Sequence, residues 1–171
     1  MVTGVPFPVP PIPYDVVVDH VRPRQLAAAT ASAASNANLG PLIIGLLNNV
    51  WPLLRSQGVK TGHNVVVYYA GSPLRLAAGV EVYGEFEPTD VVQPVTTPAG
   101  EAATTAHWGE YTALRGAYDA LERWCAASNR QLAGTSWEVY GDWHDDPAQV
   151  RTDVYMLLEP DRGEPVGGTE L

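Results

Sequence analysis

The alternation of apolar and polar residues predicts a chain built mostly of β-strands, with two helices between them. Seven segments are β-branched or alternate in polarity, as strands do: 14–21, 25–32, 64–70, 79–87, 102–108, 136–140 and 151–159. Two longer segments carry apolar residues at helical spacing, 39–57 and 111–128. Pro41 suits the first turn of the earlier helix, whereas Pro52 predicts a kink or a restart.

The order strand, helix, strand, strand occurs twice, at a separation of about seventy residues. The first copy covers about 14–88 and the second about 95–160. Each unit alone has one helix for one small sheet and would leave an apolar face uncovered. Pairing the two units buries both faces and leaves a groove along the seam. The pattern therefore predicts one α+β domain over 14–160.

Both ends of the chain differ in composition from this domain. Residues 1–13 are rich in proline, which excludes a helix or a central strand and predicts an extended or disordered arm. Residues 161–171 are rich in glycine and proline and predict a flexible tail.

Composition narrows the classes of partner. The 171 residues hold 10 Lys and Arg against 19 Asp and Glu, a formal net charge of −9, and no cluster of cations. This balance argues against direct binding to nucleic acid or to an anionic membrane. A single cysteine, Cys125, excludes an internal disulfide and a thiolate-rich metal site. With no signal-peptide pattern and no apolar run of about 20 residues, the expected compartment is the cytoplasm.

Two carboxylates within predicted strands are the candidate chemical groups. Alternation places Glu138 on one face with Ser136 and Tyr140, and Glu81 on one face with Tyr83. A carboxylate desolvated among aromatic rings has a raised pKa and can bind a cationic ligand or act as a general base. The alternative is that these faces point to solvent, where glutamate in a strand is ordinary.

Aromatic residues are the second candidate group, because planar rings offer stacking surfaces and attract cations. The chain holds five tryptophans and eight tyrosines. Those predicted to line the seam and contact a ligand are Trp51, Tyr68, Tyr83, Trp108, Tyr111, Trp137, Tyr140, Trp143 and Tyr155. Core packing is the alternative for each of them, and it is the interpretation for Trp124.

Motifs for other chemistries are missing from the sequence. The four histidines lack the spacing of a metal site, so no metal is expected. No serine nucleophile elbow, phosphate-cradling loop or dinucleotide fingerprint occurs, so no cofactor is expected.

Three stretches of the second unit together resemble the GyrI-like family: His107-Trp108-Gly109-Glu110-Tyr111, Trp137-Glu138-Val139-Tyr140 and Thr152-Asp153-Val154-Tyr155. The resemblance implies duplicated βαββ units in a pseudo-two-fold arrangement with a central ligand cleft. It also implies a lipophilic, often cationic, aromatic ligand held against a buried glutamate. Glu110 stands where the family usually has proline, and Trp108 where the residue is usually small or basic, which suggests a more aromatic pocket edge.

Three functions stay open at this point. The first is a stand-alone binding protein that senses or sequesters a lipophilic aromatic compound, with a protein partner also possible. The second is a hydrolase of cyclopropane-containing alkylating natural products, in which Glu138 and Glu81 position water; one subfamily of the resembled family does such chemistry. The third is an acidic inhibitor protein that acts on a topoisomerase.

Overall fold

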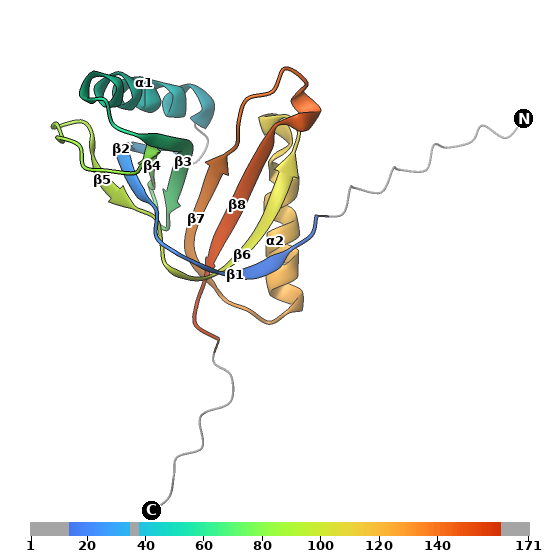
Figure 1. Cartoon of the computed structure of the whole chain (residues 1–171). Helices are drawn as coiled ribbons and strands as arrows, with labels where there is room; N and C mark the ends of the chain where they lie inside the picture. Colours follow the sequence, from blue (N-terminus) through green and yellow to red (C-terminus); the bar gives the residue numbers. More distant parts are fainter. Residues whose placement is uncertain (1–13, 35–37, 162–171) are drawn as a thin grey trace, which may run out of the picture.

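The computed structural model describes residues 14–34 and 38–161, which form an antiparallel sheet with two helices (Figure 1). The predicted arm at 1–13 and nearly all of the predicted tail lie outside the described residues. The elements follow one another along the chain as β1 (Val17–Val21), β2 (Gln25–Ala33), α1 (Leu39–Gln57), β3 (Thr61–Tyr69), β4 (Leu74–Val82), β5 (Gln93–Thr96), β6 (Gly100–Trp108), the 3-10 turn η1 (Tyr111–Ala113), α2 (Arg115–Ala127), β7 (Leu132–Tyr140), the 3-10 turn η2 (Pro147–Gln149) and β8 (Arg151–Leu158).

The strand order reveals the duplication. The sheet runs β1-β6-β8-β7-β3-β4-β2-β5, so β7 and β3 form its central pair. Outward from that pair come β8 and β6 on one side and β4 and β2 on the other. The unit β2-α1-β3-β4 is thereby related to β6-α2-β7-β8 by a pseudo-two-fold axis at the β3–β7 seam. The predicted α+β class with duplicated βαββ units is confirmed.

Two flanking strands are exchanged between the units. β1 precedes the first unit in sequence but pairs with β6 of the second, from Val17 opposite Thr104 to Val21 opposite Gly100. β5 precedes the second unit but pairs with β2 of the first. The sequence did not predict β5, because four residues that include Pro94 are too short and too interrupted to show alternation. The exchange ties each unit to the other at both edges of the sheet.

Helix α1 agrees with its predicted range. The Asn38 side chain accepts a hydrogen bond from the Gly40 amide at its start, and Gly58 ends it in a left-handed conformation. The predicted restart at Pro52 does not occur, since one helix runs through it. Pro52 is exposed, so water can hydrate the carbonyl of Asn48 that a proline leaves without a partner.

Helix α2 is shorter than predicted, because its first turn is the separate 3-10 turn η1. Its buried stripe, Ala117, Leu121 and Cys125, falls at the predicted helical spacing. The predicted stop at Asn129 is confirmed, with that residue at a φ of 55°. Two strands are shifted as well: β4 begins at Leu74, before the predicted 79–87 segment, and ends at Val82, and β7 begins at Leu132, before the predicted 136–140 segment.

Alternation along the strands gives the sheet two distinct faces. On the helix face, Val66 and Ala78 pack under α1, while Val154 packs under α2. The opposite face has its own core, which includes Val65 and Ala77. Neither α1 nor α2 lies on that opposite face, so the sheet itself encloses these residues. In the described part of the chain, neither helix is long and apolar enough to cross a membrane.

Candidate functional site

Glu138 lies at the centre of the helix face, beside the seam between the units. In the register of β7 it is opposite Val66 of β3 and Val154 of β8. Val66 belongs to the cluster under α1 and Val154 to the cluster under α2. The carboxyl group therefore lies between the two helices, and the residue is only 4% exposed. The face that Glu138 shares with Ser136 and Tyr140 is therefore the one that the helices cover.

Three tyrosine hydroxyls surround this carboxyl group. Tyr118 of α2 donates a hydrogen bond to Oε1 at 2.6 Å, and Tyr140 of β7 donates to Oε2. The hydroxyl of Tyr68, from β3, is the third, and it lies close enough to influence the pKa of Glu138. Within residues 14–34 and 38–161, no Lys, Arg or His side chain forms an ion pair with it. The buried acid has phenol donors but no countercharge.

Burial controls the protonation of the group. Desolvation raises the pKa of Glu138, although the hydrogen bonds from the three tyrosines act in the opposite direction. Burial, together with the adjacent carboxylate, also raises the pKa of Tyr68, Tyr118 and Tyr140. The phenols therefore remain protonated donors at neutral pH. Of these four groups the carboxyl group loses its proton at the lowest pH, so it is the ionisable centre of the site.

A fourth tyrosine extends this aromatic cluster toward solvent. Tyr111, in η1, contacts Tyr140 edge-to-face with ring centroids 5.4 Å apart. It is exposed, whereas Tyr68, Tyr118 and Tyr140 are partly buried. The arrangement offers aromatic surface beside a buried negative charge, which suits a ligand that is both aromatic and cationic.

Sequence reasoning missed Tyr118. The residue falls beside the buried stripe of α2, where helical spacing alone predicts core packing. The signal lay in the phenol itself, because a tyrosine on a buried stripe needs a partner for its hydroxyl. That partner is Glu138, twenty residues further along the chain.

Comparison with known proteins agrees with this architecture. Residues 70–159 match the family described as the GyrI-like small molecule binding domain, which is more than half of the chain. The chain belongs to this family. Its matched part includes α2, β7 and β8, and therefore Tyr118, Glu138 and Tyr140. The family assignment makes small-molecule binding the general activity of this fold. A search of curated proteins gives no match.

Solved structures with this GyrI-like fold are similar in shape but distant in sequence. The crystal structure of the EcmrR C-terminal domain is 18% identical, with a TM-score of 0.70, and the match covers 86% of this chain and 99% of that one. EcmrR in a cryo-EM complex with DNA is 16% identical, with a TM-score of 0.74; the match covers 86% of this chain but 58% of the EcmrR chain. The structure of SAV2435 bound to tetraphenylphosphonium is 8% identical, with a TM-score of 0.53 and coverage of 87% and 95%. At these identities the likeness shows the fold alone.

Within this GyrI-like fold, the predicted ligand residues separate into groups. Glu138, Tyr68, Tyr111 and Tyr140 come together on the helix face. Trp137 and Tyr155 stack on the opposite face, with ring centroids 5.1 Å apart and an interplanar angle of 1°.

The remaining predicted aromatics lie away from Glu138. Trp51, in α1, donates its indole N–H to Asn64 Oδ1 of β3 at 2.9 Å. Tyr83 is exposed just after β4. Trp108 and Trp143 line a separate cavity together.

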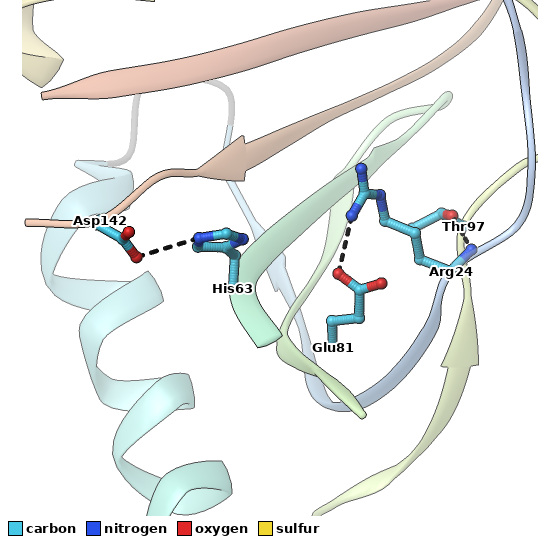
Figure 2. Close-up of polar contacts among 5 residues, drawn as sticks. All are labelled: Arg24, His63, Glu81, Thr97 and Asp142. Atoms are coloured by element: carbon cyan, nitrogen blue, oxygen red, sulfur yellow. Dashed lines mark hydrogen bonds and ion pairs between the residues drawn. The ribbon is translucent and has the colours of Figure 1, made fainter. Parts of the chain in front are cut away.

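Glu81 does not join Glu138. It lies on the opposite face, where Arg24 Nη1 is 2.8 Å from its Oε2 (Figure 2). The Arg24 amide donates in turn to Thr97 Oγ1 at 2.7 Å, which fixes the segment that carries the guanidinium. Glu81 therefore has a countercharge that Glu138 lacks. Since the sheet separates the two carboxylates, a single water molecule cannot contact both.

Proposed function

We propose that this protein binds a lipophilic aromatic cation between its two helices, with Glu138 as the counter-ion, and so senses or sequesters the compound. The observation that carries the proposal is the burial of Glu138 beside the hydroxyls of Tyr68, Tyr118 and Tyr140, with no cationic partner among residues 14–34 and 38–161. Membership of a small-molecule-binding family supports it.

The preference for a cation follows from the energetics of the buried carboxylate. A charge removed from water without a partner costs several kcal/mol, and a ligand cation offsets that cost by pairing with it. The tyrosine rings contribute a further ~0.5–2 kcal/mol for each cation–π contact. A neutral ligand of the same shape receives the aromatic contacts but not the charge pairing. The site therefore selects for charge as well as for shape.

Binding of tetraphenylphosphonium, measured by isothermal titration calorimetry, tests this proposal. That cation is the probe because SAV2435, which shares the fold, is described as bound to it. We expect saturable binding to the unmodified protein and a loss of about tenfold or more in affinity for Glu138→Gln. Glu81→Gln is the matched control, because it makes the same change on the opposite face, and we expect it to leave the affinity unchanged. Equal affinities for all three proteins would contradict the proposal.

Mass spectrometry of the recovered ligand distinguishes binding from turnover. Incubation with cyclopropane-bearing alkylating compounds is expected to return each compound intact. A product heavier by one water molecule, formed repeatedly and lost in Glu138→Gln, would instead identify the protein as a hydrolase.

A further inference from the structure

A cavity of about 530 Å³ lies on the face of the sheet opposite Glu138. It is formed where β6 and β7 end and β8 begins, and it is walled by the β7–β8 connection. Its aromatic and charged lining consists of His63, Trp108, Asp142, Trp143, His144, Arg151 and Asp153. We propose that this cavity is a second ligand site that takes a planar organic cation. The proposal is independent of the Glu138 site, because the sheet lies between the two.

The two tryptophans of this cavity are unusually exposed. Trp108 is 57% exposed and Trp143 is 73% exposed, whereas Trp51, Trp124 and Trp137 are buried or partly buried. Indole rings left in water keep a large unsatisfied apolar area, and two that share one cavity mark a binding surface. The volume falls within the ~300–1,000 Å³ of small-molecule pockets.

One of these indole rings already contacts a cation that belongs to the protein itself. The Arg151 guanidinium lies over the Trp108 ring at 5.5 Å from its centroid, and its Nε is 2.8 Å from Asp153 Oδ1. The guanidinium is flat and positively charged, so it shows which ligand chemistry the ring and the carboxylate accept together. Arg151 is half-exposed and can move aside. A ligand cation can therefore replace it against the same two partners.

The charges around the cavity also favour a cation. His63 Nε2 lies 3.2 Å from Asp142 Oδ1, and Figure 2 shows the two side chains pointing toward each other from β3 and from the segment after β7. The lining thus holds two carboxylates against the single guanidinium of Arg151. Asp145 and Asp146 follow in the same connection, and the whole chain carries a net charge of −9. An anionic ligand would meet repulsion here, whereas a cation is attracted.

Equilibrium dialysis with N-methylacridinium, and with its neutral parent acridine, tests the second site. The background is Glu138→Gln, which removes the counter-ion of the first site but leaves the opposite face intact. We expect one saturable site for N-methylacridinium to persist, and Trp143→Ala or Trp108→Ala to weaken it about fivefold or more. Tyr83→Ala, which truncates an exposed aromatic side chain at a different cavity, is the control and is expected to have no effect.

Arg151→Gln gives a result that only a cation site predicts. Removal of the internal competitor frees the Trp108 ring and Asp153, so the affinity for N-methylacridinium is expected to rise about threefold or more, with little change for acridine. Weaker cation binding by Arg151→Gln, or equal binding of acridine and N-methylacridinium, would overturn the proposal. The absence of any saturable site in Glu138→Gln would also overturn it. None of these results tests the proposed Glu138 site, which the tetraphenylphosphonium titration tests separately.

Discussion

At the residue scale, the buried carboxyl group of Glu138 lowers the stability of the fold while serving the proposed ligand site. A carboxyl group held between two helices has a raised pKa, so the folded state keeps its proton to a higher pH than the unfolded state does. Stability therefore falls as pH rises from the usual carboxyl value of 4.5 through the raised pKa, and it remains lower above that range. A buried carboxylate that lowers the free energy of unfolding is expected to persist where its charge binds a ligand.

Replacement of Glu138 by glutamine is expected to stabilise the protein at neutral pH. The amide keeps hydrogen-bonding capacity for the tyrosines but carries no charge to desolvate. Thermal unfolding should show a higher Tm for Glu138→Gln at about pH 7.5, with about 2–4 °C for each kcal/mol gained. The difference should shrink toward about pH 4, where the wild-type carboxyl group is protonated in both states.

The control for this prediction is Glu81→Gln, which removes a carboxylate that has Arg24 as its partner and should not raise Tm. A lower Tm for Glu138→Gln across the whole pH range would show that the charge is not a cost to the fold.

Sequence alternation identified Glu138 but could not separate it from Glu81. Alternation places a residue on one of two faces without saying which face the helices cover. Glu81 satisfied the same pattern, yet its face carries Arg24, a partner contributed by the distant segment before β2. Tyr118 was missed for a related reason, because the contact between a helix residue and a strand residue depends on how the helix packs.

At the element scale, periodicity predicted every long strand and both helices. It could not predict β5, whose four residues gain their structure from pairing with β2 rather than from their own pattern. It also predicted a kink or a restart at Pro52, and the restart does not occur, since one helix runs through the proline. The local sequence pattern therefore agrees with the observed helices and long strands, and it fails where an element depends on tertiary pairing.

Two glycines illustrate opposite requirements within these elements. Gly45 lies exposed in α1, and a Cβ built there meets no atom within 4 Å, so Gly45→Ala should raise the free energy of unfolding by about 1 kcal/mol. Gly79 lies in β4 against β2, and a Cβ built there comes within 2.6 Å of the Ala28 Cβ. Gly79→Ala should therefore lower the free energy of unfolding by about 1–3 kcal/mol. Urea unfolding of both variants checks the pair, and a stabilising Gly79→Ala would contradict the strand packing.

At the scale of the whole molecule, the exchanged strands make the two units interdependent. β1 and β5 each leave their own unit to pair with the other, and β3 pairs with β7 at the centre. Neither unit can separate without losing strand pairing at three places. The same seam carries Glu138, so the proposed ligand site lies beside the central pairing that joins the units.

We expect the protein to unfold in one cooperative step. Urea titrations followed by tryptophan fluorescence and by far-UV circular dichroism should give coincident transitions. Trp51 reports from the first unit and Trp124 from the second, so Trp51→Phe and Trp124→Phe variants show whether both units unfold together. Two separate midpoints would contradict the interlocked arrangement.

The most direct test of the account is the pKa of the Glu138 carboxyl group, measured by NMR with ¹³C-labelled glutamate and assigned by the signal that Glu138→Gln lacks. The free protein should show a pKa above the usual 4.5. Saturation with tetraphenylphosphonium should lower that pKa, by about one unit for each tenfold preference of the cation for the ionised form. A Glu138 pKa that stays the same with and without the cation would contradict the claim that this carboxylate is the ligand's counter-ion.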